Sequence, residues 1–598
     1  MSGKVLIKNK ATKIDLFNFS TPQMRAFHVS WFAFFLCFFA WFGIAPLMAV
    51  VREELSLTKA QIGNTIIASV AVTIFARLFI GWACDRIGPR LTYTWLLLIC
   101  SMPVMGIGLA NSYETFLLFR LGIGAIGAAF VITQYHTSVM FAPNCVGTAN
   151  ATSAGWGNLG GGVTQMVMPL VFAGFIGLGF TTAASWRLSM VVAGAVCFLT
   201  GIAYFFLTTD LPDGNFKELR AKGEYRPAEK VKGTFMLATK DKRVWALFLI
   251  YAACFGVELT INNIAALYYI DNFGLGLKTA GLVAGLFGLM NIFARTTGGI
   301  IGDKFGARWG LKGRVRWLFI GLVIEAIALM VFSRMTVLPV AIATMVIFSL
   351  FVQMSEGATF SVVPFINKKA LGSVAGIVGA GGNAGAVAAG FLFRSEIPWS
   401  QCLLIMGFIV LAIAFTTHLV TFSKEDEENA AAEYKRALQE RREIAGLPPL
   451  TEEELNNPGT LAPVLAKIQP MDVLRVFLGG ALVVKGIYFI LNMQEIEAMT
   501  QSIGVADNAI AWYVVLAHIA GGLGLALGMF TRGAALANVP VLLGALMFVH
   551  SGEGLFSSSE GMQFSVLVLV CLGLFAWKGA SNLSLDGMNR DKAASAAG

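Results

Sequence analysis

The sequence predicts an all-helical polytopic membrane protein built from two matching six-helix halves, followed by a four-helix transmembrane module. The chain of 598 residues is 56% hydrophobic and only 13% charged, which is too apolar for a soluble protein. Apolar runs long enough to cross a bilayer recur from residue 28 to residue 577. A motif in which an arginine precedes an aspartate by eight residues occurs at 74–90 and again at 292–308. The chain therefore contains an internal repeat.

Composition also excludes several kinds of site. The eight cysteines are scattered without a CxxC pair, so neither a metal site nor a disulfide framework is predicted. Positive charge is concentrated in short loops, where it sets topology and does not indicate nucleic-acid binding. The glycine-rich sequence GAGGNAG lies within an apolar run, which argues against a nucleotide-binding loop. No cofactor and no nucleic-acid partner are expected. No cleavable signal peptide is expected either, because the first 27 residues are too polar.

The charges divide the chain into predicted segments. The twelve spans of the two halves are expected at 28–51, 60–83, 91–113, a fourth that has Arg120 near its start, a fifth within the charge-free stretch 121–186, 188–209, 244–270, 279–302, 317–334, 335–366, 370–394 and 397–423. Four more are expected at 474–493, 508–531, 533–551 and 561–577. The resulting domains are the N-terminus 1–27, the first half 28–209, a linker loop 210–243, the second half 244–423, a charged linker 424–470, the C-terminal module 471–580 and a tail 581–598.

The basic residues alternate between the two sides of the membrane. The N-terminus, the loop 86–90, the segment 210–243 and the loop 304–316 are rich in Lys and Arg, whereas the loop 52–59 is nearly neutral. The positive-inside rule therefore places the N-terminus and both copies of the repeated motif in the cytoplasm. Sixteen spans return the C-terminus to the same side, and the expected location is an inner (plasma) membrane. The charged linker 424–470 has a helix-forming composition, and its simplest interpretation is a solvated cytoplasmic segment.

Two arginines at matching positions are the first candidate binding residues. Arg77 and Arg295 precede Asp85 and Asp303 by eight residues, which in a helix is a rise of roughly 12 Å. If each aspartate marks a helix end, each arginine lies near the middle of the bilayer, where a charge is costly unless it has a function. The planar guanidinium fork suits a small oxyanion. The alternative is that the arginines pair with Glu258 or Glu356 and lock the halves together.

Two glycine-rich helices carry an asparagine at equivalent positions, Asn158 and Asn383. An amide at membrane depth needs a partner, so both are predicted to contact the substrate or the arginines. Packing alone would explain the glycines, because small residues let helices approach closely. These signature glycines are Gly155, Gly157, Gly160, Gly161, Gly162, Gly379, Gly381, Gly382 and Gly385.

Further polar residues follow the same repeat. Gln134 and Gln353 are 219 positions apart, close to the spacing of the arginines, and Gln134 is predicted to line the site. His136 is either a proton carrier or, as a lone histidine near a span end, structural. Glu258 either neutralises an arginine or, like Glu356, titrates as a proton-coupling group. The loop motifs, expected to form a gating latch, comprise Asp85, Arg86, Gly88 and Arg90, and in the second copy Asp303, Lys304, Gly306 and Arg308.

The motifs resemble a known family. GWACDRIGPR (81–90) resembles the loop motif of the major facilitator superfamily, and GWGNLGGG (155–162) and GAGGNAG (379–385) resemble the two signatures of its nitrate/nitrite porter (NarK-like) family. ITQYHTSVMF, FGVELTINN and FVQMSEGATFSVVPF resemble bacterial, plant and fungal members. The resemblance covers about residues 28–423 and implies the major facilitator fold, alternating access, and nitrate binding by Arg77 and Arg295. The presence of Glu258 resembles the pattern of the proton-coupled uptake members more than that of the exchangers. His136 stands where the family pattern has tryptophan.

The last four spans look like a separate module. The helix at 471–492, with Arg475 and Lys485, resembles the start of a DoxX-type membrane domain. Lys485 in mid-span could pair within the module, reach a membrane face or mark a site of its own. His518 and His550 are the only histidines in this module. They could serve as a pair of haem ligands, but no other feature of the sequence supports haem.

Together these patterns predict a secondary transporter of nitrate, and also nitrite, that is not an enzyme and works by nitrate:proton symport in nitrate assimilation. The runner-up is nitrate/nitrite antiport. A distant alternative is a membrane redox component or an anion sensor. The expected partners are nitrate or nitrite, protons and the lipid bilayer, without a known protein partner.

Overall fold

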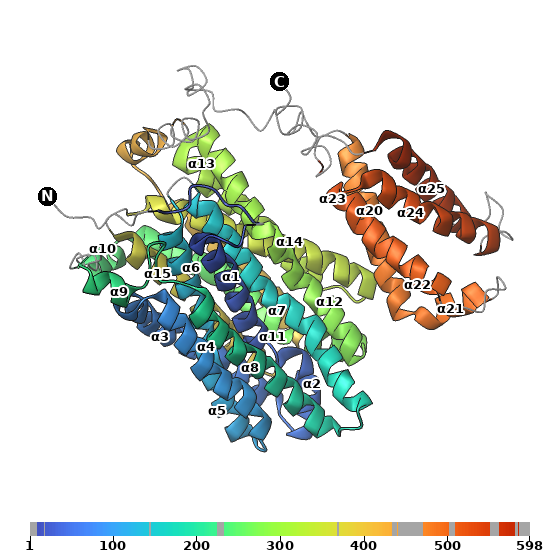
Figure 1. The fold of residues 1–598 in the computed structure, drawn as a ribbon, viewed down its shortest axis with the longest axis horizontal. Coiled ribbons are helices and arrows are strands. Elements are labelled where there is room, and N and C mark those ends of the chain that lie inside the picture. Colours follow the sequence, from blue (N-terminus) through green and yellow to red (C-terminus); the bar gives the residue numbers. More distant parts are fainter. Residues whose placement is uncertain are drawn as a thin grey trace. The chain divides into compact units, whose positions relative to one another are not determined.

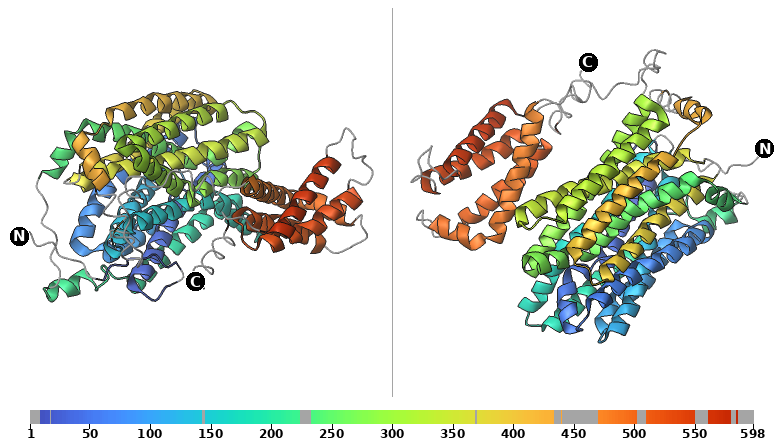
Figure 2. Two further views of the ribbon diagram at one scale, coloured as in Figure 1. Left: turned by 90° about the horizontal axis from the view of Figure 1, so that it is seen from above. Right: turned by 180° about the vertical axis from the view of Figure 1, so that it is seen from behind.

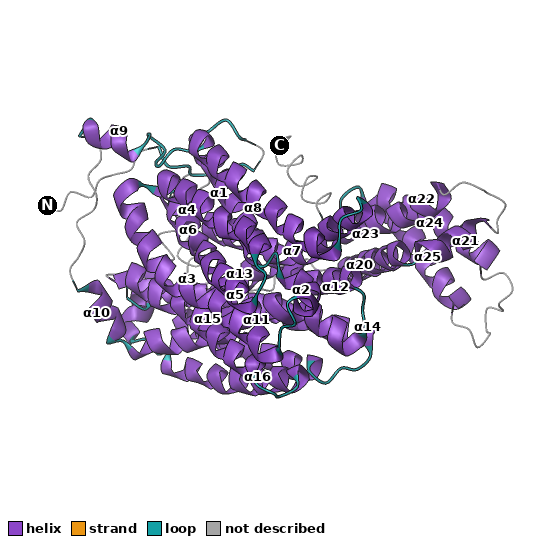
Figure 3. Ribbon diagram, turned by 90° about the horizontal axis from the view of Figure 1, so that it is seen from below, coloured by secondary structure: helices purple, strands orange, loops and turns teal. Residues whose placement is uncertain are grey.

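The computed structural model describes residues 9–16, 18–142, 145–223, 233–367, 370–432, 439, 470–501, 509–549, 561–579 and 584. Two compact units, Met1–Pro458 and Gly459–Gly598, divide the chain. Their regular structure in this described part is helical, apart from isolated bridges (Figure 3). Fourteen of the described helices are long and apolar enough to cross a membrane. The all-helical membrane fold predicted from composition is confirmed.

The first half of unit 1 begins with a span bent at a short 3₁₀ turn, Ala45–Leu47. Its helices are α1 (Pro22–Trp41), α2 (Met48–Glu54), α3 (Lys59–Ile87), α4 (Pro89–Gly106), α5 (Tyr113–Gly124), α6 (Ala129–Met140), α7 (Val146–Gly177) and α8 (Thr182–Leu207). Local sequence sets their ends. Thr58 and Gln61 form a capping box that starts α3. Gly88, at φ +90°, ends α3, and Pro89 starts α4 with its fixed φ.

The second half has the same order of long helices. They are α11 (Lys242–Phe273), α12 (Leu277–Leu289), α13 (Ala294–Phe332), α14 (Leu338–Val362), α15 (Leu371–Arg394) and α16 (Trp399–Ala414), preceded by the short α9 (Phe216–Ala221) and α10 (Thr234–Thr239). The predicted loop 304–316 is mostly helical. The chain leaves helical geometry only at Trp309 and Gly310, and the latter takes φ +67°, which favours glycine. α13 is thus two helices joined at a sharp turn.

The long helices of this unit run roughly parallel to one another (Figures 1 and 2). The span that contains α1 and α2 and the span formed by α11 are the most buried candidate spans, so they lie in the core. Contact between the halves is made by α3 against α15 and by α7 against α12. These are the helices that carry the predicted arginine of the first half and both predicted asparagines.

The two halves are closed at one end and separate at the other. At the closed end, Gly63 of α3 packs directly on the backbone of Arg394, and Arg52 pairs with Asp271 at 2.6 Å. Contact along α3 and α15 continues as far as Arg77 and Gly379. Beyond that point, a Cβ atom added at Gly376 or Gly372 would meet no described atom of another helix within 4 Å. The helices therefore diverge past Arg77, toward the end that carries Asp85.

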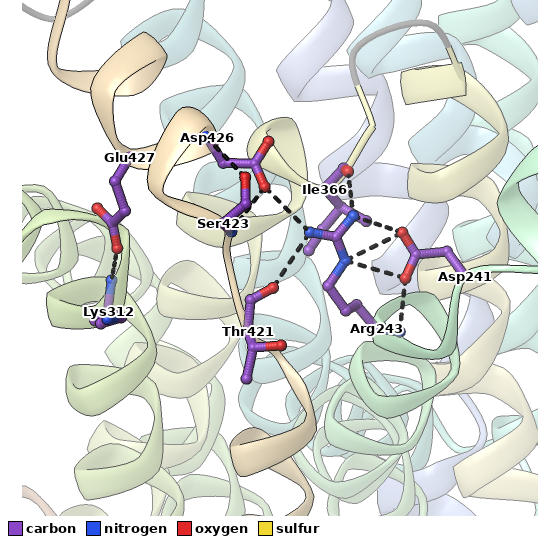
Figure 4. Close-up of polar contacts among 8 residues, drawn as sticks. All are labelled: Asp241, Arg243, Lys312, Ile366, Thr421, Ser423, Asp426 and Glu427. Atoms are coloured by element: carbon purple, nitrogen blue, oxygen red, sulfur yellow. Dashed lines mark hydrogen bonds and ion pairs between the residues drawn. The ribbon is translucent and has the colours of Figure 1, made fainter.

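A polar cluster at that end holds the start of the charged linker (Figure 4). Arg243 donates to Asp241 (2.7 Å) and to the Ile366 carbonyl oxygen (2.9 Å), and it pairs with Asp426 at 3.9 Å. Burial raises the pKa of Asp241, but the hydrogen bonds from Arg243 and the positive charges of Arg243 and Lys242 together lower it by more, so this carboxyl group stays ionised at neutral pH. The described linker residues 424–432 are helical.

Glu427 in this linker helix caps another helix. Its carboxylate accepts the backbone N–H groups of Leu311 (2.6 Å) and Lys312 (3.1 Å), immediately after the turn in α13. A carboxylate at a helix N-terminus satisfies free N–H groups and complements the helix dipole. The segment predicted to be a solvated linker therefore starts as a docked helix. Most of the remaining linker lies outside the described residues.

Glu427→Ala is expected to release this docked segment. Loss of two hydrogen bonds to a charged acceptor should lower the opening free energy of residues 424–432 by about 1.5–3 kcal/mol. Hydrogen exchange followed by mass spectrometry would then show faster exchange in that segment. Glu428→Ala is the matched control, because Glu428 is exposed. Equal exchange in the two variants would contradict the capping role.

The C-terminal unit is a small helical bundle. Its helices are α20 (Pro470–Leu491), α21 (Met493–Gln501), α22 (Ala509–Leu516), the π-helix Ala517–Gly521, α23 (Gly522–Leu527), α24 (Thr531–Gly544) and α25 (Gly561–Lys578). Arg475 donates to the carbonyl oxygens of Leu525 (2.8 Å) and Ala526 (2.6 Å). It thus occupies the C-terminal end of α23, where cations are favoured. Lys485 lies 5.0 Å from the ring centroids of Tyr488 and Phe489, so the ring contacts described for it lie within the module.

Candidate functional site

Arg77 on α3 reaches across to the other half of unit 1. Its Nη1 donates to the carbonyl oxygen of Gly379 on α15 at 3.0 Å. Its Nε and Nη2 are buried and have no hydrogen-bond partner in the described part of the chain. A buried guanidinium with two free N–H groups on one edge can accept an anion side-on through two parallel hydrogen bonds.

Arg295 at the start of α13 is anchored within the second half. Its Nη1 pairs with Glu356 of α14 at 2.5 Å, and its Nη2 donates to the hydroxyl of Tyr251 on α11 at 2.7 Å. The alternative reading of an arginine–glutamate pair thus holds for Arg295. However, Glu356 and Arg295 belong to the same half, so the pair does not lock the halves together. Arg77 contacts a carbonyl oxygen instead of a carboxylate.

One aromatic ring connects the two arginines. The guanidinium carbons of Arg77 and Arg295 lie 5.8 Å and 5.9 Å from the ring centroid of Phe255 on α11. Phe130 of α6 faces Arg77 at 5.6 Å. Cation–π contacts of this kind stabilise a desolvated guanidinium by about 0.5–2 kcal/mol. The two repeats therefore bring their arginines together at the interface between the halves, as the repeat predicts.

Two buried carboxyl groups adjoin Arg295. Glu258 accepts hydrogen bonds from the side-chain amides of Asn291 (2.8 Å) and Asn158 (3.4 Å). The carboxyl groups of Glu258 and Glu356 also lie close enough to interact electrostatically. Both side chains are 0% exposed. Two carboxylates close together at a buried site are mutually destabilising unless one binds a proton or an arginine lies between them.

Asn383 is a buried amide whose hydrogen-bonding groups are both unsatisfied among the described residues. It follows Gly379 by four residues on α15, so it lies on the helix face that holds Arg77. Its partner amide, Asn158, is bonded to Glu258. Asn158 of the first half is thus bonded to a carboxyl group beside Arg295, and Asn383 of the second half lies on the helix face that holds Arg77.

The signature glycines lie at close helix contacts. A Cβ atom at Gly160 would lie 2.0 Å from the Phe35 carbonyl oxygen of α1, and one at Gly381 would lie 2.2 Å from the Phe248 carbonyl oxygen of α11. Gly162 packs directly on Gly288 of α12. Packing explains these positions. Gly379 differs, because its carbonyl oxygen accepts the hydrogen bond from Arg77, and a Cβ atom there would lie at an ordinary contact distance of 3.8 Å from Arg77 Nη1.

Other predicted residues lie outside this contact set. Gln134 donates to the Asn150 carbonyl oxygen of α7 at 3.2 Å, and Gln353 donates to that of Phe287 at 3.0 Å. His136 is buried with both ring nitrogens engaged, by the Tyr204 hydroxyl at 2.6 Å and the Thr209 carbonyl oxygen at 2.8 Å. This arrangement supports the structural reading of His136.

The first loop motif is held by the segment that follows α8. Asp210 accepts the Arg90 backbone N–H at 2.9 Å, and a Cβ atom at Gly88 would clash with its carboxylate. Arg220 donates to the carbonyl oxygen of Arg86 at 2.7 Å. In the second motif, Asp303 pairs with Arg314 across the turn in α13. Each motif thus fixes the turn between two spans within its own half, where the sequence predicted a latch.

The structure adds residues that the sequence did not single out. Tyr251, Phe255 and Asn291 contact the arginines or Glu258, and Glu325 on α13 is a third fully buried carboxyl group. Aromatic residues are too frequent in this chain to signal a site. Glu325, as a lone carboxylate within an apolar run, did carry the signal that identified Glu258. Of the two histidines considered for haem, His518 bonds to the Val514 carbonyl oxygen, and His550 lies outside the described residues.

Known proteins resemble this chain in sequence and in fold. The chain is 41% identical to the high affinity nitrate transporter 2.5 of Arabidopsis thaliana over 69% of this chain and 83% of that protein. It is 28% identical to the nitrate/nitrite transporter NrtP of Nostoc punctiforme, over 71% and 97%. Among solved structures, a D-xylose-proton symporter matches with a TM-score of 0.53 at 14% identity, covering 68% of this chain and 99% of that one. That likeness shows the fold alone.

A family model confirms the wider relationship. The Major Facilitator Superfamily model matches residues 30–363 and 254–598. These relatives are transporters, so the protein is not an enzyme. The DoxX-like character of the C-terminal unit stays a prediction. The chain belongs to the nitrate/nitrite porter family of the major facilitator superfamily.

Proposed function

We propose that the protein transports nitrate, and also nitrite, across the inner membrane in symport with protons. The observation that carries this proposal is the convergence of Arg77 and Arg295, one from each half, on Phe255 beside two buried carboxyl groups. Nitrate is planar and singly charged, and it suits the free Nε and Nη2 edge of Arg77. Asn383, buried without a hydrogen-bond partner among the described residues, would donate a further hydrogen bond. The relatives named above for nitrate transport support this choice of anion.

Charge balance supports symport. With Glu258 and Glu356 ionised, the two arginines are neutralised, and a nitrate ion would add one uncompensated negative charge to a buried site. If one carboxyl group takes a proton as nitrate arrives, the site stays neutral. Glu356 is the better candidate, because its protonation also releases Arg295 Nη1 for the anion. Nitrate and a proton would then cross together, since moving a net charge through the closed state is costly.

The conformation supports alternating access. The halves separate beyond Arg77 toward the end that carries Asp85, and positive-inside topology assigns that end to the cytoplasm. We therefore assign this structure to the inward-facing state, with both termini cytoplasmic. The Arg52–Asp271 pair would then help to close the periplasmic side. Breaking these contacts and closing α3 onto α15 at the other end would expose the arginines outward.

The test is nitrate uptake into proteoliposomes with and without an imposed inward proton gradient. Symport predicts accumulation only with the gradient, and uptake of protons together with nitrate. Uptake that ignores the gradient but requires nitrite inside would instead establish nitrate/nitrite antiport. No nitrate movement under either condition would refute the transport proposal.

Deletion of residues 430–598 is expected to leave transport intact. Unit 1 forms its own compact body, and it contains both arginines and the residues described above as their contacts. The deletion also retains Glu427 and its cap on α13. Uptake by the truncated protein should match that of the full chain when both are corrected for the amount reconstituted. Loss of uptake by a stably folded truncation would mean that the C-terminal module takes part in transport.

A further inference from the structure

Glu325 is a buried carboxyl group that has no role in the nitrate site proposed above. It lies on α13 beyond the turn at Gly310, and its side chain is 0% exposed. Neither of its carboxyl oxygens has a well-aligned hydrogen bond in the described part of the chain, and no described cation pairs with it. An ionised carboxyl group in such surroundings costs several kcal/mol, so it requires either a partner or a proton.

Its neighbours connect it to the arginine site. The carboxyl group of Glu325 is close to the hydroxyl of Ser355 on α14. Ser355 Oγ is buried and makes no well-aligned hydrogen bond in the described part of the chain, so its hydroxyl must rotate to bond either carboxyl group. Gly321 lies one turn earlier on the same face of α13. A Cβ atom there would be 3.2 Å from Ser355 Oγ, so Ser355 packs against this face. Ser355 directly precedes Glu356, the partner of Arg295. A serine hydroxyl both donates and accepts, so it can pass a proton between two carboxyl groups.

The other surroundings of Glu325 offer no competing charge. The titratable groups that face it are Glu356 on α14 and Cys254 on α11. On the remaining side, α16 packs on α13 through Gly407, which contacts Ala326 and Met330. α16 itself contains no Asp, Glu, Lys, Arg or His. Among the described neighbours of Glu325, Glu356 is therefore the only other carboxyl group with which it could exchange a proton.

We propose that Glu325 stores the proton that is delivered to Glu356 in each transport cycle, a role that rests on the proposed symport. The O–H bond of Glu325 breaks as its proton passes to Ser355 Oγ, and the Ser355 proton passes to the Glu356 carboxylate. Glu356 thereby becomes neutral and releases Arg295, and the negative charge moves to Glu325. Nitrate then replaces that charge beside Arg295. Glu325 takes up a new proton from water on the side where nitrate entered, because its ionised form has no compensating partner. Glu356 releases its proton on the other side as nitrate leaves, so one proton crosses with each nitrate ion.

The test separates net uptake from exchange in proteoliposomes containing the full chain. Exchange of internal for external nitrate at equal pH requires only that the loaded carrier reorient with its proton in place. Net uptake requires the proton to leave and return in every cycle. Glu325→Gln is therefore expected to lose proton-driven accumulation and to retain exchange. Ser355→Ala should show the same split. Thr344→Ala, on the same helix, is the control, because its hydroxyl bonds only to carbonyl oxygens of α14.

Three results would overturn the relay. Glu325→Gln could accumulate nitrate like the wild type. It could lose both modes while the purified variant still binds nitrate normally, which would mark Glu325 as structural. If Glu325→Gln does not fold, normal accumulation by Ser355→Ala would also overturn it. The wild type tests symport separately, because gradient-independent uptake refutes symport whatever the variants do.

Discussion

Arg77→Lys is expected to reduce the affinity for nitrate by roughly tenfold to a hundredfold, because a hydrogen bond to a charged group contributes about 1.5–3 kcal/mol. A lysine ammonium at this position keeps the positive charge and can still reach the carbonyl oxygen of Gly379. It cannot reproduce the parallel Nε–H and Nη2–H donors, which are free on the native guanidinium. Arg295→Lys should be at least as damaging, because Arg295 bonds Glu356 and Tyr251 through two different nitrogens.

Initial rates of nitrate uptake over a range of concentrations would measure this effect as a rise in KM. Arg334→Lys provides the matched control, since Arg334 is exposed and distant in sequence from both arginines. The two site variants should also bind nitrate more weakly as purified proteins. A KM for Arg77→Lys equal to that of the wild type would show that the charge alone matters. The side-on binding mode would then be wrong.

Gly160→Ala is expected to destabilise the folded protein by about 1–3 kcal/mol, the usual cost of overpacking. The added methyl group would lie 2.0 Å from the carbonyl oxygen of Phe35, and backbone cannot rotate away as a side chain can. α1 and α7 must therefore separate. Gly381→Ala should behave alike, because its methyl group meets the carbonyl oxygen of Phe248 at 2.2 Å.

Thermal unfolding of the purified protein would report this loss as a lower Tm. The control lies on the same helix, because a Cβ atom at Gly174 has no neighbour within 4 Å. Gly174→Ala should therefore be neutral. If Gly160→Ala and Gly174→Ala have the same Tm, close packing is not what requires glycine at position 160.

The sequence determined the membrane fold and the residues that carry charge at membrane depth. Bilayer thickness fixes the length of an apolar run, and lipid makes every buried charge costly, so Arg77, Arg295, Glu258 and Glu356 could be identified without coordinates. The internal repeat further predicted that the arginines of the two halves would meet. The contacts of both with Phe255 agree with this. Charge and period are properties of the chain itself.

Only the tertiary structure decided which groups pair. Periodicity could not show that Glu356 holds Arg295 while Glu258 is bonded by Asn158 and Asn291, since these helices are far apart in sequence. Nor could composition show that Glu427 docks on α13, because a charged helix has the same composition whether solvated or capping. Partner choice depends on distances of a few ångströms between distant segments, and those distances are set by helix packing.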